Sequence, residues 1–347
     1  MQSLRKIYYL WRILTKRTIY ETVPPYNFSW FRSFTSLDFL LSKNPIYLID
    51  VGARGGSCEE LEPLQSYISY TGFDADKKES DRLNTYPPKG YKSFKTFPFY
   101  VGRKSGKQEF HLYKNLGSSS QLLPNPEFQN SFGSDLSIER TIIVDGITLD
   151  EFLKDAEQIV DILKLDTQGT ELDVLKCAEK ILNQALIIES EVEFIEMYQG
   201  QPLYHDVAAF LYQRGFTLLY LNRVFGNRER YKGLSRGQIL FGDALFGLRK
   251  DFVQRLDWVK QFKYCVLLIN YGHLDYAHDI YTSNLILQEK VPGLGAFFQK
   301  EIEANSSWWG RRKKKMIFRF EKLVYLFLSI RKTNGLTSDS DRSWPTR

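Results

Sequence analysis

The chain has few of the residues that build metal sites and disulfide frameworks. It contains 3 cysteines and 4 histidines among 347 residues. Cys58, Cys177 and Cys265 are far apart, and no Cys-x-x-Cys or Cys/His spacing occurs. This pattern supports neither a zinc site nor a set of disulfides. We therefore expect reduced thiols, as is usual in a cytoplasmic protein.

Long apolar runs are also missing. The stretch 7–14 is interrupted by Arg12 and is followed by no small-residue cleavage site, so no secretory signal peptide is expected. The stretch 323–328 is too short to span a bilayer. The sequence thus predicts a cytoplasmic location.

Positive charge is concentrated at the two ends. Residues 1–17 hold Lys and Arg with no acid, and 311–332 hold nine Lys/Arg against Glu321 alone. Since the net charge is only +6, the body between these segments is acidic. A nucleic-acid enzyme would carry its basic surface around the active cleft, so we expect no nucleic-acid substrate. The segment 311–332 also has apolar residues, which either contact a membrane surface peripherally or, as we favour, pack on the core.

Short apolar strands alternate with helical segments in the middle of the chain. The expected strands cover 46–50, 70–74, 94–101, 107–113, 159–166 and 185–189, with a closing pair at 216–221 and 243–248. The expected helices cover 58–67, 171–182 and 203–214, and 115–135 is expected to be a loop. This alternation predicts a doubly wound, mostly parallel α/β sheet, in which the last strand can be antiparallel.

The composition divides the chain into three parts. Residues 1–40 are a basic, aromatic leader, 41–250 form the α/β domain, and 251–347 form a helical appendage with a basic tail. The appendage is expected from two helical stretches, 252–268 and 276–287, that flank a glycine. One helix pair does not establish a repeat array.

A glycine-rich turn follows the first strand, with the sequence Asp-Val-Gly-Ala-Arg-Gly-Gly over residues 50–56. Glycine lets the backbone approach a ligand closely, although a plain tight turn is the alternative. The spacing is not Gly-x-Gly-x-x-Gly, which disfavours a nicotinamide or flavin cofactor. No Lys-Ser/Thr follows, so a phosphate-binding P-loop is excluded.

Acidic residues stand at the ends of further strands. Asp74 ends the second strand, where a carboxylate can accept hydrogen bonds from ribose hydroxyls. Asp76 is the alternative, and either residue could instead cap a helix. Asp166 ends another buried strand. Because ligands of open α/β sheets bind outside the carboxyl ends of the strands, Gly52, Asp74 and Asp166 should converge there.

Five segments together resemble the FkbM-type methyltransferases, in the same order and over roughly residues 46–248. They are IDVGARGG, YTGFDAD, VDGITLDEFL, DILKLDTQGTELDVLKCA and IIESEVEFIEMYQGQPLYHDVAAFLYQRGFTLLYL. The resemblance implies a class I, Rossmann-like fold that binds S-adenosylmethionine and methylates hydroxyl oxygens of sugars or natural products. It also implies a cofactor loop at Asp50, Gly52 and Gly55, ribose recognition by Asp74, and Asp166 beside the methionine moiety or the acceptor.

The chain departs from the family pattern at three places. The family commonly has Asn followed by a hydrophobic residue where this chain has Arg54-Gly55. It commonly has Glu-Pro where this chain has Asp74-Ala75, and a Glu where this chain has Gln168. Asp74 keeps the chemistry of a carboxylate. Gln168 removes a charge, which puts a metal or acid/base role at that position in doubt.

Methylation of a hydroxyl requires in-line geometry, and a base or a metal should assist the weak nucleophile. The candidates are Asp166, Glu191, Glu193 and His205, of which we select Asp166, Glu191 and His205 as catalytic. Solvent-exposed charges explain the two glutamates equally well, and a surface or capping role explains the histidine. An Mg²⁺ held by Asp166 and Glu191 is a further alternative, which lacks a third ligand.

These patterns predict an S-adenosylmethionine-dependent O-methyltransferase acting on a sugar, a polysaccharide precursor or a related small acceptor. The alternative is a non-catalytic binding or scaffolding protein that keeps the fold, motivated by Gln168 and the altered glycine turn. The sequence makes no prediction of oligomeric state.

Overall fold

The computed structural model describes residues 34–56, 58–154, 159–233, 235, 237–306 and 337–339. They form two compact units. The α/β unit contains 45–58, 65–253 and the described residues after 333, and the helical unit contains the described residues up to 44, 59–64 and those of 254–332.

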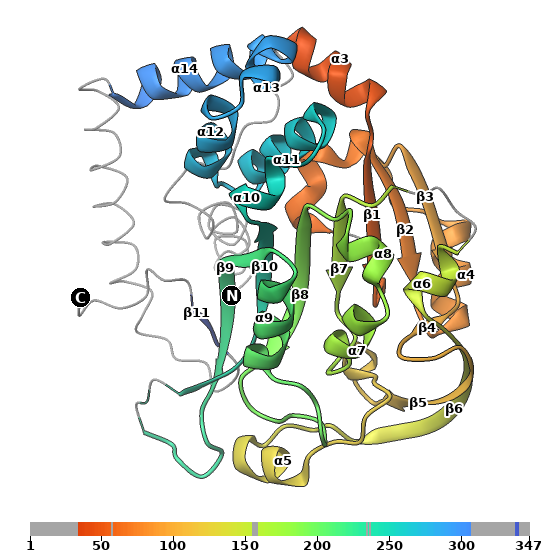
Figure 1. Ribbon diagram of the computed structural model, residues 1–347. Coiled ribbons are helices and arrows are strands. Elements are labelled where there is room, and N and C mark those ends of the chain that lie inside the picture. Colours follow the sequence, from red (N-terminus) through yellow and green to blue (C-terminus); the bar gives the residue numbers. More distant parts are fainter. Residues whose placement is uncertain are drawn as a thin grey trace, which may run out of the picture. The chain divides into compact units, whose positions relative to one another are not determined.

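A mostly parallel sheet is the centre of the α/β unit (Figure 1). Its strand order is β11-β9-β10-β8-β7-β1-β2-β3. The strands are β1 (Ile46–Val51), β2 (Ile68–Phe73), β3 (Ser93–Phe97), β7 (Ile162–Leu165), β8 (Ile187–Glu193), β9 (Phe216–Gly226), β10 (Gln238–Leu248) and β11 (Thr337–Asp339).

The direction of the strands confirms the predicted fold class. β3, β2, β1, β7 and β8 pair in parallel, whereas β10 is antiparallel to both β8 and β9. The chain moves outward from β1 to β3 and then returns to the other side of β1 with β7. The strand order therefore reverses between β1 and β7, and this is where open α/β sheets bind ligands.

The parallel strands are apolar along almost their whole length. β1 (IYLIDV) and β7 (ILKL) each have a single half-buried position, and the rest of their side chains are buried. Strands with helices on both faces read as continuous apolar runs in this way. Besides α5, which is described below, the α-helices of this unit are α4 (Lys77–Thr85), α6 (Leu149–Phe152), α7 (Glu171–Lys176), α8 (Glu179–Leu182), α9 (Tyr204–Gln213) and α10 (Lys250–Val253).

Several predicted elements differ from the observed ones. The predicted strand 94–101 is wrong as one element, because it divides around Pro98 into β3 and β4 (Tyr100–Val101), which belong to different sheets. The predicted helix 171–182 divides into α7 and α8. The predicted helix 58–67 is the 3₁₀ helix η1 (Glu59–Tyr67), which contains Pro63, a residue without a backbone N–H.

A second, smaller sheet is inserted between β3 and β7. It has the order β4-β6-β5, with β5 spanning Gly106–Tyr113 and β6 spanning Ile138–Ile147. Between β5 and β6, the predicted loop 115–135 contains η2 (Leu116–Ser118) and α5 (Pro126–Phe132). Figure 1 shows α5, β5 and β6 beyond the carboxyl ends of the main strands.

The helical unit has more helices than the predicted pair. It contains α3 (Thr35–Lys43), α11 (Trp258–Asn270), α12 (Leu274–Thr282), α13 (Leu285–Lys290) and α14 (Pro292–Ser306). Asp257 caps α11 by accepting hydrogen bonds from two backbone N–H groups of its first turn. Within the described residues, no helix is long and apolar enough to cross a membrane. The basic segment 311–332 lies outside the described residues.

Candidate active site at the carboxyl ends of the strands

The register of the sheet brings the predicted residues to one edge. Val51 is opposite Phe73 on one side and opposite Leu165 on the other, and Leu165 is opposite Ser190 of β8. The residues that follow Val51, Phe73 and Leu165 therefore leave the sheet side by side, next to Glu191 of β8. The structure thus places the Gly52, Asp74 and Asp166 region on a common edge, as the sequence predicts.

Gly52 packs closely against the backbone that follows β7. Its φ is +87°, and a Cβ placed on it would lie 1.9 Å from the carbonyl oxygen of Asp166. The amides of Gly52 and Ala53 both donate to the carbonyl oxygen of Phe73, each at 2.9 Å. Only glycine fits this position, because a side chain would collide with the backbone after β7.

Gly55 lies farther out on the same turn and is not crowded. Its φ is +84°, and no heavy atom lies within 4 Å of a Cβ placed there. Its amide donates to Glu79 Oε1 at 3.0 Å, which ties the turn to α4. The turn is thus closed against Asp166 at Gly52 and open at Gly55.

Asp50 is buried beneath this turn and is surrounded by partners from the protein itself. Lys164 Nζ lies 3.3 Å from Asp50 Oδ1, and the Tyr70 hydroxyl donates to Oδ2 at 2.6 Å. Cys58 Sγ is 3.7 Å from the same oxygen. Burial lowers the pKa of Lys164, but the negative groups around it, Asp50 first and then Asp166, together outweigh burial, and the pKa is raised. The ion pair joins β1 to β7 below the turn.

Asp74 is 7% exposed at the end of β2. Burial raises its pKa to about 6, while Arg54 acts in the opposite direction. Asp74 Oδ1 accepts the Asp76 amide at 2.7 Å and lies 3.7 Å from the Arg54 guanidinium. In the described part of the chain, Asp74 Oδ2 accepts no hydrogen bond.

Asp76 has the capping role that the sequence left as an alternative. Its side chain accepts the Lys78 amide at 3.0 Å and caps α4. The other oxygen, Oδ2, lies 3.3 Å from the Arg54 guanidinium. Of the two acids, Asp74 is therefore the one with an acceptor oxygen to spare.

The β7–β8 side of the edge is organised around Gln168. Its amide nitrogen donates to Asp166 Oδ1 at 2.8 Å and to Glu191 Oε2. Its amide oxygen accepts from the Tyr198 hydroxyl at 3.0 Å, and its carbonyl oxygen accepts from Ser120 Oγ at 2.7 Å. One neutral side chain thus connects two of the predicted catalytic acids.

The acids on this side retain protons more readily than usual. Burial, followed by the charge of Asp166, raises the pKa of Glu191 well above its ordinary value. Burial also raises the pKa of Glu193 well above its usual range, with Glu171 adding to the effect. The pKa of Glu171 is raised to about 7 by burial, against the backbone N–H groups that it accepts from. This cluster can hold and release a proton near neutral pH.

Glu193 and His205 differ in position from what the sequence indicates. Because β8 extends to Glu193, both Glu191 and Glu193 lie within a strand, and Glu193 is only 3% exposed. His205 is in the first turn of α9, where its side chain is 74% exposed and its Nε2 is 3.5 Å from Asp206 Oδ2. The histidine thus faces solvent, where its ring nitrogen lies near Asp206 and not near the side chain of Gln168. No group of three or more His, Cys, Asp or Glu in the described ranges is arranged to hold a metal ion.

Sequence reasoning missed four residues that organise this edge: Arg54, Lys164, Gln168 as a bridge, and Tyr198. The sequence does indicate a role for Lys164, because a lysine within the apolar strand ILKL needs a buried counter-ion. The sequence indicates a role for Arg54 less clearly, through its position inside the glycine turn. Nothing in the sequence indicates a role for Tyr198, because it is 30 residues from Gln168 and contacts it only in the folded chain.

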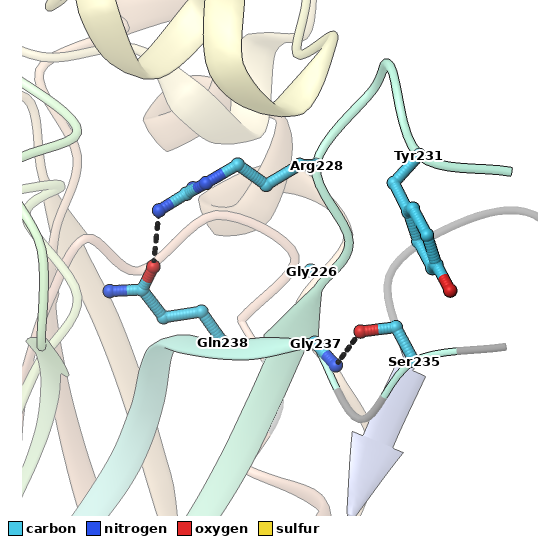
Figure 2. Close-up of a pocket in the computed structure, with 6 residues that line it drawn as sticks. All are labelled: Gly226, Arg228, Tyr231, Ser235, Gly237 and Gln238. Carbon is cyan, nitrogen blue, oxygen red and sulfur yellow. Dashed lines mark hydrogen bonds between the residues drawn. The ribbon is translucent and has the colours of Figure 1, made fainter. Parts of the chain in front are cut away.

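The hairpin between β9 and β10 reaches the same edge, since Phe241 of β10 pairs with Glu193. A hollow of about 200 Å³ lies at its tip, lined by Gly226, Arg228, Tyr231, Ser235, Gly237 and Gln238. Figure 2 shows Arg228 and Gln238 joined by a hydrogen bond of 2.9 Å, with Tyr231 and Ser235 on the other side of the hairpin. The polar groups do not converge on one point, so we assign no ligand to this hollow.

Comparison with known proteins places the sheet edge in a family context. Residues 46–218 match the family model described as the methyltransferase FkbM domain. No curated protein matches the chain.

Solved structures give only distant likenesses. The magnesium protoporphyrin IX methyltransferase of Synechocystis, with bound SAM, has a TM-score of 0.32 and 10% identity, covering 63% of this chain and 79% of that chain. The 1,6-didemethyltoxoflavin-N1-methyltransferase of Burkholderia thailandensis has a TM-score of 0.27 and 9% identity, covering 71% and 86%. The family assignment rests on the match over residues 46–218.

Proposed function

We propose that this chain, which belongs to the FkbM methyltransferase family, methylates a hydroxyl of a sugar, a polysaccharide precursor or a related small acceptor. Its class, an S-adenosylmethionine-dependent methyltransferase, follows from the family match. The observation that carries the proposal is the meeting of Gly52, Asp74 and Asp166 where the strand order reverses between β1 and β7. This is the position at which the fold offers a ligand site.

The residues on the β1–β2 side fit an adenosyl cofactor. Asp74 Oδ2 is available to accept from a ribose hydroxyl, and the open face of Gly55 leaves room for a ligand beside the turn. We assign ribose binding to Asp74 and close backbone approach to Gly52 and Gly55. Asp50 acts through the turn, because its oxygens are held by Lys164 and Tyr70. The cofactor supplies an electrophilic methyl group and leaves as a neutral thioether.

The residues on the β7–β8 side handle the proton. As the acceptor oxygen bonds to the methyl carbon, its hydroxyl proton must move to a base. We assign this role to Asp166, which is half-buried and next to the cofactor turn, with Glu191 as its partner. Burial and the charge of Asp166 raise the pKa of Glu191, so Glu191 holds a proton more readily than an ordinary glutamate. His205 is left out of this assignment because its ring faces solvent.

We further propose that Mg²⁺ is not required between Asp166 and Glu191. The amide nitrogen of Gln168 stands between their oxygens and donates to both. An N–H donor in that place repels a cation, and oxygen ligands are what Mg²⁺ needs. Turnover should therefore be unchanged in the presence of EDTA.

The remaining proposals concern partners and location. The acidic body of the chain favours a small acceptor over nucleic acid. We place catalysis in residues 41–250, with 251–347 as an appendage. A cytoplasmic location, with peripheral membrane contact through 311–332, stays a prediction.

An acceptor screen tests the function. The chain is incubated with S-adenosylmethionine carrying a deuterated methyl group and a panel of sugars, sugar nucleotides and glycolipids, and products are analysed by mass spectrometry. We expect label on a hydroxyl oxygen, lost in Asp166→Asn. Label on nitrogen or carbon would contradict the proposed acceptor class. Absence of S-adenosylhomocysteine binding at millimolar concentration would instead favour a scaffolding protein.

A further inference from the structure

Gln168 has an unusual backbone conformation. Among the described residues it alone, apart from glycines, has a positive φ, with a value of 57°. The left-handed region is unfavourable for an L-residue, because its Cβ lies too close to the following carbonyl oxygen. Residues held in this region are concentrated at functional sites, where the surrounding structure fixes them.

Contacts from two distant segments hold this conformation. Ser120, which is fully buried, donates to the carbonyl oxygen of Gln168, and Tyr198, also fully buried, donates to its amide oxygen. The Tyr198 hydroxyl lies 2.9 Å from the carbonyl oxygen of Ser118 as well. Gln168 is therefore fixed from the insert and from the segment after β8.

The side chain of Gln168 is oriented by the charges around it. An amide oxygen turned toward Asp166 and Glu191 would face their carboxylate oxygens, whereas the amide nitrogen has two N–H groups to give. With the nitrogen inward, each acid can receive one hydrogen. This orientation satisfies both acids, while the amide oxygen shares the single hydroxyl hydrogen of Tyr198 with the carbonyl oxygen of Ser118.

We propose that Gln168 is a positioning residue, whose neutral amide holds Asp166 and Glu191 in the arrangement that receives the acceptor proton. The proposal rests on the proposed function and deepens it. A lysine or arginine in this place would also join the two acids, but its charge would make them poor bases. An amide aligns them and leaves the base strength largely intact.

The electrostatic surroundings make the amide important. The acids that act on Glu191 come from every neighbouring element: Asp166 after β7, Glu193 on β8, Glu171 on α7 and Asp243 on β10. In the described ranges, no salt bridge joins Glu171, Glu191 or Glu193 to a cation. A further negative charge at position 168 would therefore add to the repulsion within this cluster.

Two substitutions separate positioning from folding. Gln168→Gly removes the amide and also the cost of the positive φ, so the protein should stay folded. Gln168→Glu keeps the size and replaces the donor by a charge. Gln199→Glu is the matched control, because it adds the same charge at an exposed position nearby.

The first readout is the titration of side-chain carboxyl carbons by NMR in the complex with S-adenosylhomocysteine. Gln168→Glu should raise the midpoint of the Glu191 titration by about one pH unit or more, as expected for a like charge in contact. Gln199→Glu should leave it unchanged. An unchanged Glu191 midpoint in Gln168→Glu would overturn the proposal. This titration needs no acceptor, so it decides the role of Gln168 even if the acceptor screen fails.

The second readout is turnover of the acceptor found in the screen. We expect Gln168→Gly to lower kcat about tenfold or more, with KM and S-adenosylhomocysteine affinity within about twofold of wild type, as for a group that acts only in the transition state. In Gln168→Glu, the acid limb of the pH profile should move to higher pH. Wild-type kcat in Gln168→Gly, or an equal loss of kcat and of cofactor affinity, would contradict positioning.

Discussion

The two halves of the sheet edge treat their acids differently. On the β1–β2 side, Asp50 is paired with Lys164 and Asp76 with Arg54, so positive charges accompany the carboxylates. On the β7–β8 side, Asp166 and Glu191 share the neutral amide of Gln168. This contrast is the basis on which we propose a binding half and a reacting half.

The difference follows from what each half has to do. A carboxylate that accepts hydrogen bonds from a ribose must stay ionised, and a nearby cation favours that form. A carboxylate that takes up a proton must not be held ionised too strongly. In the described residues, the two acids joined by Gln168 form no salt bridge, whereas Lys164 of β7 is paired across the sheet with Asp50 of β1.

The largest expected effect comes from removing a cation of the binding half. Lys164→Met leaves Asp50 buried and unpaired, and breaking a buried pair costs about 3–5 kcal/mol. Unfolding in urea should show this loss. Adding Asp50→Asn should recover part of it, because the uncompensated charge is then gone. A loss below about 1 kcal/mol would mean that water already screens the pair.

The second prediction compares the two ends of the glycine turn. Gly52→Ala places a Cβ on the Asp166 carbonyl oxygen, so the turn must move, and S-adenosylhomocysteine affinity should fall about 100-fold, which is about 2.7 kcal/mol. Gly55→Ala, with a similar φ and open space, should show only the left-handed cost of about 1–2 kcal/mol in stability. Calorimetric titration measures the affinities. Equal losses of affinity would show that crowding at Gly52 is unimportant.

The third prediction concerns Asp74. Asp74→Asn should weaken S-adenosylhomocysteine binding by about 1.5–3 kcal/mol, as for hydrogen bonds to a charged group. Asp76→Asn, which alters a helix cap, should have a smaller effect. Isothermal titration of both variants decides whether the assignment of ribose binding to Asp74 is right.

The pH dependence of binding follows from the same residue. Since the folded pKa of Asp74 is about 6, above the ordinary value of 3.8, its ionised form is lost as the pH falls through 6. S-adenosylhomocysteine affinity should be constant at high pH and about tenfold lower at pH 5. The stability of the free protein changes the other way: the contribution of this group rises as pH falls from about 6 to about 4. Asp74→Asn should remove this dependence.

The sequence was a good guide to the sheet and a partial one to the site. Apolar runs such as ILKL mark buried strands, and an acid or a glycine after each run marks the edge where ligands bind. The structure of the insert between β3 and β7 was harder to predict. Asn125, Pro126 and Gly133 do signal the start and end of α5, yet the polar composition of 115–135 hid a helix of seven residues.

What the sequence could not give is the contact between distant segments. Gln168 looks like a lost charge when it is viewed alone. Its role becomes visible only when Ser120 and Tyr198, 48 and 30 residues away, meet it in the fold. The pairing of Lys164 with Asp50, 114 residues apart, is of the same kind.

The smallest expected effect is that of His205→Ala. The ring is exposed on α9, so turnover and cofactor affinity should change less than about twofold, as for most surface substitutions. A steady-state assay with the acceptor from the screen measures this. A loss of tenfold or more would bring His205 into the reacting half and would weaken the comparison drawn above.

A crystal structure of the complex with S-adenosylhomocysteine tests the central claim most directly. It should show the ribose hydroxyls hydrogen-bonded to Asp74, the ligand packed against the backbone of Gly52, and the ligand's sulfur atom facing Asp166. A ligand bound elsewhere, or one whose ribose points away from Asp74, would contradict the division of the edge into a binding half and a reacting half.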